Sequence, residues 1–258
     1  MSGRGAGRKL CVMPTLADIA FIATTFVLAG AVKGVSGMGL PTVAVGLLGL
    51  RMAPAEAAAL LIVPSLVTNV WQFAAGPHRM AALARFWPML AAIGAATWAS
   101  AGWLTSAASG RATVLLGVAL AIYAVLGLAS VRATVPARAE RWMAPVAGAL
   151  TGLVTGATGV LVIPAVPYLQ ALSLEKDDLI QALGLSFTVS TIALALGLAQ
   201  HGALPLAAAG VSTLCTIPAL LGMFAGQWVR GAIDAATFRR VFFAGLLLLG
   251  AELVARSA

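Results

Sequence analysis

The chain has 258 residues, of which 61% are hydrophobic and only 9% are charged, with a formal net charge of +8. A soluble globular domain is close to half apolar and about a quarter charged, so this composition excludes that class. Apolar stretches of about twenty residues recur along the chain, and each is long enough to cross a bilayer as a helix. The basic residues lie in short loops between these stretches, so the charge indicates membrane orientation and not nucleic-acid binding. The sequence therefore predicts an all-α, polytopic membrane protein.

In chain order, a basic, glycine-rich tail at 1–15 precedes two similar halves that together form one membrane domain. The first repeat covers 16–131, and its apolar segments are 16–33, 40–50, 55–75, 84–104 and 111–131. A basic loop at 132–141 divides the halves. The second repeat covers 142–255, and its segments are 142–154, 160–172, 178–200, 204–226 and 238–255. Each half is therefore predicted to contain a broken helix pair followed by three transmembrane helices.

The two halves also match residue by residue. The stretch GAVKG at 30–34 corresponds to GALTG at 148–152, and Glu56 and Asp178 correspond at an offset of 122. If each broken pair enters the bilayer and returns, each half makes an odd number of crossings, and the repeats are inverted relative to one another. A single kinked crossing is the alternative. We prefer the hairpin because 35 residues of helix are about 50 Å long, whereas the hydrocarbon core is about 30 Å thick.

The loop charges predict the orientation of the chain. The richer side of the hairpin topology carries Arg79, Arg85, Arg132, Arg138, Arg141, Lys176, Arg230, Arg239 and Arg240. The other side carries Arg51, Arg111, Arg256 and the tail residues Arg4, Arg8 and Lys9. The positive-inside rule places the richer side in the cytoplasm and both termini outside.

Both glycine-rich breaks are candidate binding sites, because irregular backbone inside a bilayer is tolerated where it lines a cavity or is buried in protein. The first break, KGVSGMGLP at 33–41, offers Lys33, Gly34, Ser36, Gly37 and Gly39. Pro41 is suited to the first turn of a new helix, whose free N–H groups favour anions. The second break offers Thr155, Gly156, Thr158 and Gly159. These residues predict a site for a small anion.

Polar residues on the full spans extend this candidate site. Thr68, Asn69 and Gln72 lie within about one helical turn of each other, and Ser190 is the counterpart of Thr68 in the second repeat. Structural alternatives stay open. GAVKG and GALTG are also GxxxG patterns for close helix packing, and Lys33 is long enough to extend to the headgroups. For Ser190 the pattern favours bonding between helices over contact with a substrate.

An enzymatic alternative rests on Ser36. GVSG at 34–37 fits the GxSG pattern around the nucleophile of intramembrane serine proteases. The histidine partner for such a dyad is His201, which lies in a loop, and the second repeat has no serine that corresponds to Ser36. We therefore expect a non-enzymatic protein with no catalytic residue, no metal site and no cofactor.

Four stretches, GVSGMGLPTVAVGLL, LLIVPSLVTNVWQF, GATGVLVIPAVPYLQAL and IQALGLSFTVSTIALA, together resemble the TauE/SafE (TSUP) family of sulfite exporters over about residues 16–255. The resemblance implies a multi-pass transporter of the bacterial inner membrane. Its expected role is export of sulfite or a small sulfur-containing organic anion, driven by an ion gradient, with protons among the candidate coupling ions. A passive anion channel of the same fold is the alternative. Family members often carry consecutive glycines at the breaks; here Met38 and Ala157-Thr158 intervene, so sulfite, sulfoacetate, thiosulfate and unrelated carboxylates all stay open.

Overall fold

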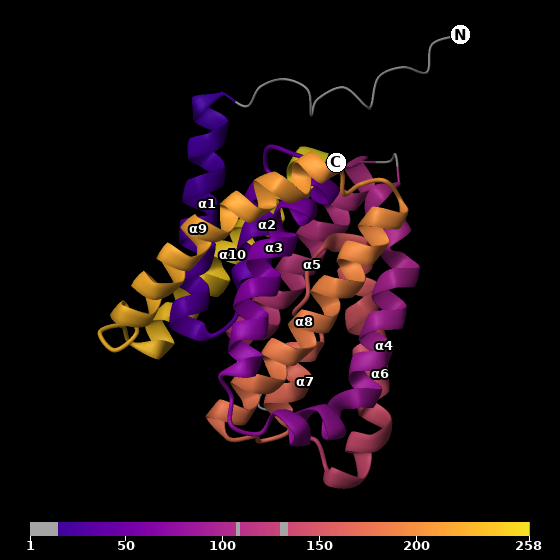
Figure 1. Cartoon of the computed structure of the whole chain (residues 1–258). Helices are drawn as coiled ribbons and strands as arrows, with labels where there is room; N and C mark the ends of the chain where they lie inside the picture. Colours follow the sequence, from indigo (N-terminus) through magenta and orange to yellow (C-terminus); the bar gives the residue numbers. More distant parts are fainter. Residues whose placement is uncertain (1–14, 107–108, 130–133, 258) are drawn as a thin grey trace.

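The computed structural model describes residues 15–106, 109–129 and 134–257. Over these ranges the chain is helical and without strands (Figure 1). The helices are α1 (Leu16–Ser36), α2 (Leu40–Leu48), α3 (Pro54–Ala74), α4 (Arg79–Thr105), α5 (Ser109–Ala129), α6 (Ala137–Thr158), α7 (Ala165–Ala171), α8 (Lys176–Gln200), α9 (Leu206–Val229) and α10 (Ala235–Ser257). Six of them, α1, α3, α4, α5, α8 and α9, are long and apolar enough to cross a membrane. The predicted all-α, multi-pass membrane protein is confirmed.

The first break forms a tight turn between a long helix and a short one. The turn includes Gly37 at φ 77° and Gly39 at φ 99°, a left-handed conformation that glycine adopts without a steric cost. Pro41 lies in the first turn of α2, as predicted. Because α2 has nine residues, it is about 14 Å long and too short to cross a bilayer. It packs against α1, which favours the hairpin over a single crossing.

The second break begins later than predicted. Helix α6 starts at Ala137, inside the stretch expected to be a loop, and continues to Thr158, so the expected break at 155–159 is largely helical. Pro145 lies inside the helix, and no proline follows it before Gly159, which ends the helix at φ 76°. Residues 160–163 are non-helical and buried, and α7 starts after Pro164. The irregular backbone of the second half therefore lies at 159–164.

The helix contacts follow a pattern that the two halves share. Helix α1 packs against α9 and α6 packs against α4, while α3 contacts α9 and α8 contacts α4 (Figure 1). The remaining major pairs are α3 with α8 and α5 with α10. Exchanging α1–α5 for α6–α10 maps this set of pairs onto itself, as a duplicated chain predicts. The inverted orientation of the two halves stays a prediction.

Glycines bring the α1–α9 pair into close contact. A Cβ atom placed on Gly30 would lie 2.1 Å from the carbonyl oxygen of Ala219, and one on Gly34 would lie 2.2 Å from that of Met223. In the second half, Gly148 and Gly152 approach α4 in the same way, at 2.3 Å and 2.6 Å from backbone oxygens. The GAVKG and GALTG stretches therefore act in close helix packing, which was the structural alternative for these GxxxG patterns.

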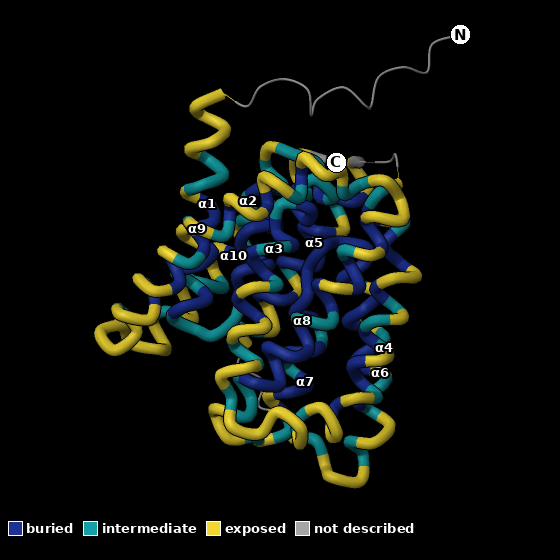
Figure 2. The backbone as a smooth tube through the Cα atoms, in the orientation of Figure 1, coloured by how far each residue is buried: buried dark blue, intermediate teal, exposed yellow. Residues whose placement is uncertain are grey.

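The buried residues lie along the centre of the bundle (Figure 2). Many large apolar side chains are exposed on its outside. Helices α2 and α7 are largely buried. Large side chains such as Trp71, Trp87, Trp103 and Trp228 are 60% exposed or more. Exposed apolar surface on this scale needs a covering of lipid, and tryptophan is the residue typical of the membrane interface.

A proline on α3 is accommodated by a serine from α9. Pro64 has no N–H to donate to Leu60, which leaves that carbonyl without its helical partner. The buried Ser212 hydroxyl donates to Leu60 O at 2.8 Å and accepts a bond from Val63 N at 3.0 Å. This bridge joins α3 to α9 in an environment where unpaired backbone groups are costly.

We expect Ser212→Ala to lower the free energy of unfolding by about 1–3 kcal/mol, because Leu60 O loses its donor and Val63 N loses its bond to the Ser212 hydroxyl. Detergent-solubilised protein followed by thermal or denaturant unfolding gives the measurement. Thr213→Val is the matched control, since the exposed Thr213 hydroxyl bonds only within its own helix, to Ala209 O. Equal stability of the two variants would contradict the bridging role.

Candidate functional site

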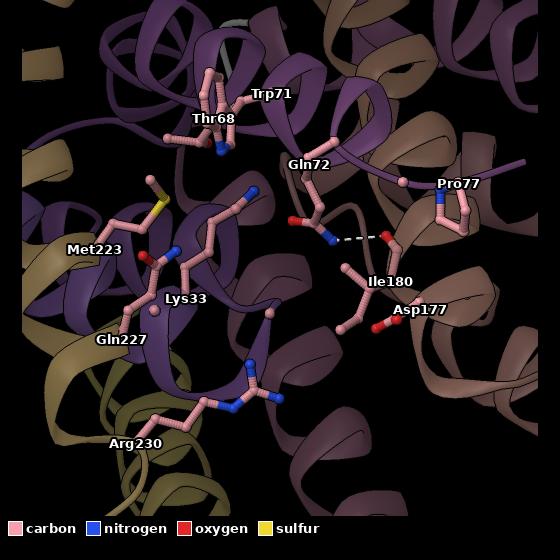
Figure 3. A pocket seen from close by; sticks show the side chains of 14 residues that line it. Lys33, Thr68, Trp71, Gln72, Pro77, Asp177, Ile180, Met223, Gln227 and Arg230 are labelled. Carbon is pink, nitrogen blue, oxygen red and sulfur yellow. Dashed lines mark hydrogen bonds between the residues drawn. The ribbon is translucent and has the colours of Figure 1, made fainter. Parts of the chain in front are cut away.

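One cavity of about 320 Å³ collects several of the predicted site residues (Figure 3). It lies where the C-terminal ends of α1, α3 and α9 meet the N-terminal turn of α8. Of the predicted residues, its walls include Lys33, Gly34, Gly37, Thr68 and Gln72. The first break and the polar face of α3 therefore line one space, as the sequence led us to expect.

Lys33 is the buried cation of this cavity. Its side chain is 3% exposed, and its Nζ donates a hydrogen bond to Oδ1 of the fully buried Asn69. Among the described residues, no carboxylate forms an ion pair with it. An ammonium group has three donors, so two of them are left without a protein partner in the described chain. Lys33 therefore does not extend to the headgroups, and it offers free donors to the cavity.

The remaining walls come from residues that the sequence did not single out. Arg230 and Gln227 at the end of α9 and Trp71 on α3 line the cavity, together with Met223 and Asp177 (Figure 3). Arg230, Gln227 and Asp177 are exposed, which places them at the mouth, whereas Lys33 lies at depth.

The sequence contains a spacing pattern that places Arg230 on the face of α9 that packs against α1. Gly222, Gly226 and Arg230 are spaced four apart, so they share one face of α9. Cβ atoms on the two glycines would lie within 2.2 Å of α1 backbone oxygens, which turns this face toward α1. Arg230 follows Gly226 by one helical turn, so it is directed to the C-terminal end of α1, which carries Lys33.

Glutamine side chains hold the rim of the cavity together. Gln72 on α3 donates to Ile180 O of α8 at 2.8 Å, which leaves its amide oxygen toward the cavity (Figure 3). In return, Gln181 on α8 donates to Phe73 O at 3.0 Å and accepts from His78 N at 3.0 Å. These bonds satisfy the backbone at the end of α3 and fix α3 against α8.

A charged pair lies just outside this rim. His78 Nδ1 and Asp178 Oδ1 are 2.8 Å apart. The hydrogen bond to the carboxylate, together with its charge, raises the pKa of His78 above its usual value. His78 is solvent-exposed in the α3–α4 connection, so the pair belongs to the surface at the mouth and not to the buried site.

Three predicted residues of the first half, Ser36, Gly39 and Asn69, are not among the lining of the cavity. The Ser36 hydroxyl bonds to the carbonyl oxygens of Val32 and Met38, and it therefore stabilises the turn. Gly39 is the N-cap of α2, with φ 99°. Asn69 is joined to the cavity through Lys33. Substrate contact by these three residues stays a prediction.

The predicted residues of the second half are not among the lining of this cavity. Thr155 donates to Val160 O at 3.2 Å and Thr158 to Val154 O at 2.7 Å, so both hydroxyls bond within the turn. A Cβ atom on Gly156 would lie 2.1 Å from Ser100 Oγ, and Gly159 ends α6. Ser190 bonds within its own helix, to Ser186 O at 2.9 Å. Their predicted role in binding substrate is untested, and their observed contacts are structural.

The cavity is suited to a small anion. It combines a buried amine with free donors, a guanidinium at the mouth and two side-chain amides, all within a multi-helical membrane bundle. Interrupted helices and an uncompensated intramembrane cation are features of membrane transporters. The fold and the site together therefore define a polytopic membrane protein of the transporter class.

Comparison with known families gives the particular assignment. The family model described as "Sulfite exporter TauE/SafE" matches residues 22–253. The chain therefore belongs to the TauE/SafE family of membrane transporters, which confirms the resemblance of the glycine-rich breaks and the polar helices. No curated protein and no solved structure matches the chain.

Proposed function

We propose that this protein is a secondary transporter that exports sulfite, or a small sulfur-containing organic anion, across the bacterial inner membrane and is driven by an ion gradient. The observation that carries the proposal is Lys33, a buried amine that lines a cavity and has a neutral amide as its protein partner. A charge in that position is costly without a counter-ion, and a bound anion supplies one.

The dimensions and access of the cavity support the same function. A volume of about 320 Å³ equals the share of roughly ten water molecules, enough for a sulfur oxyanion with part of its hydration or with a short organic group. The site opens at the end that carries Arg79, Lys176 and Arg230, which positive-inside reasoning places in the cytoplasm. With that orientation, the cavity is accessible to an anion from the cytoplasm.

The test is sulfite flux in proteoliposomes, measured with and without an imposed pH gradient. Flux that accelerates with the gradient and shows exchange of internal for external sulfite is the result expected for a coupled carrier. Flux that follows only the electrochemical gradient of sulfite would identify a passive channel of the same fold. Absence of sulfite flux together with transport of an organosulfonate would move the substrate to that class.

An intramembrane serine protease is the weaker alternative. Its nucleophile, Ser36, bonds to two backbone oxygens, while His201 bonds to Gly197 O and His78 faces Asp178. No contact in the described chain joins Ser36 to a base that would activate it. Ser36→Ala is expected to leave anion transport intact, and proteolysis that is lost in this variant would overturn the assignment.

Arg230 at the mouth is expected to contribute to loading of the anion. We expect Arg230→Ala to raise the apparent KM for sulfite about twofold to fivefold with an unchanged maximal rate, because an exposed charge attracts the anion through water. The effect should fade at high ionic strength. Arg239→Ala, an exposed arginine outside the cavity lining, is the control. Equal KM values for both variants would remove Arg230 from the site.

A further inference from the structure

Four buried polar side chains form a continuous line from α1 through α3 to α8. Lys33 donates to Asn69 Oδ1, and Asn69 Nδ2 donates to Ser65 Oγ at 3.0 Å. The hydroxyl oxygens of Ser65 and Thr191 are 3.2 Å apart. All four residues are 3% exposed or less, so protein groups and not bulk water determine these bonds.

The far end of this line fixes the direction of every bond in it. Thr191 donates its single hydroxyl proton to Phe187 O at 2.7 Å, and a carbonyl oxygen can only accept. Thr191 must therefore accept from Ser65, and Ser65, with its proton committed, must accept from Asn69. The Asn69 amide nitrogen is thereby directed to Ser65, and its oxygen is directed to Lys33.

We infer that Ser65 and Thr191 are positioning residues of the anion site, an inference that rests on the proposed function. Their hydroxyls hold Asn69 in the one orientation that presents an acceptor to Lys33. With the amide reversed, an N–H group would face the N–H donors of the lysine, a repulsive contact. This line of hydrogen bonds therefore keeps Lys33 in place, with its two free donors available to an anion.

The same line of hydrogen bonds also joins the two halves of the protein. Ser65 lies on α3 of the first half and Thr191 on α8 of the second, and the 3.2 Å between their hydroxyl oxygens is longer than the usual range of about 2.5–3.0 Å, so the bond is weak. A relative displacement of about 1 Å breaks it. The orientation of Asn69, and with it the affinity of the Lys33 site, is therefore coupled to the alignment of α3 with α8.

An NMR measurement on the substrate-free protein tests this line of hydrogen bonds directly. In protein labelled at the lysine Cε, the Lys33 resonance is identified by its loss in Lys33→Arg. We expect Thr191→Val to shift this resonance, because the amide next to Lys33 loses its fixed orientation. Thr188→Val is the matched control, since Thr188 lies on the same helix and bonds only to Gly184 O of that helix, at 2.7 Å. Identical spectra for the two variants would overturn the inference.

Flux measurements extend the test to function. Thr191→Val is expected to raise the apparent KM for sulfite about tenfold with little change in maximal rate, whereas Thr191→Ser, which keeps the hydroxyl, restores the wild-type KM. Ser65→Ala should behave like Thr191→Val, which covers the case in which one variant fails to fold. A KM that follows thermal stability and not the presence of the hydroxyl would overturn the inference. A shifted Lys33 resonance in a protein that transports no sulfite would keep the positioning role and reject the proposed substrate.

Discussion

Lys33→Ala is expected to lower sulfite flux by about a hundredfold, the largest effect of any single substitution in the site. Lys33 is 3% exposed, and no other lysine or arginine of the described chain is buried, so no second cation at that depth replaces it. Removal of one partner of a buried charge pair typically costs about 2–5 kcal/mol, which corresponds to factors from about thirty to several thousand. Initial rates in proteoliposomes, with protein incorporation measured in parallel, give the result.

Two comparisons separate binding from folding in this variant. Lys176→Ala removes an exposed lysine near the mouth and is expected to leave flux within twofold of wild type. The thermal stability of Lys33→Ala should be no lower than that of wild type in the absence of anion, because the substitution removes an uncompensated buried amine. Full flux in Lys33→Ala would show that the amine is not part of the anion site.

The second large effect is expected from Gly222→Ala on α9. A Cβ atom there would lie 2.0 Å from Val27 O and within 3 Å of two further backbone atoms of α1. Because backbone atoms of a packed helix cannot rotate away, α1 and α9 must separate. We expect a loss of about 3 kcal/mol in the free energy of unfolding, together with loss of transport, because Lys33 and Arg230 lie on these two helices.

Gly210→Ala provides a control on the same helix. No heavy atom lies within 4 Å of a Cβ placed at Gly210, so alanine fits and improves helix propensity by up to about 1 kcal/mol. Denaturant titration in detergent compares the two variants directly. If both alanine variants were equally stable, the close approach of α1 and α9 would be wrong.

Much of the architecture is determined by local properties of the sequence. Helix length and apolar character are summed over about twenty neighbouring residues, so the six long apolar helices were predictable from the sequence. The predicted span at 238–255 lies in α10, which is not among these six in the described chain. The turn at Gly37 and Gly39, with Pro41 in the next helix, was predictable because the conformational freedom of these residues is intrinsic. Lys33 was identifiable because a charge within an apolar stretch is exceptional in any fold.

Other features were decided by contacts between distant segments. The end of α6 at Thr158, four residues beyond the predicted 154, depends on the backbone ladder and Gly159. Arg230 joins Lys33 in one cavity because the glycine face of α9 packs on α1, and the two residues lie almost two hundred positions apart in the chain. Ser65 and Thr191 meet only because α3 packs against α8.

One physical reason separates the features that the sequence predicts from those that the tertiary structure decides. The sequence by itself determined the elements of this protein, because helix formation, turn formation and partition into a membrane depend on neighbouring residues. Tertiary structure alone decided which polar groups share a site: Lys33 acquired Asn69 as its partner, whereas Thr155 and Thr158 bonded within their own turn. In a membrane interior an unpaired polar group is costly, and the partner that such a group finds is determined by which helix faces pack together.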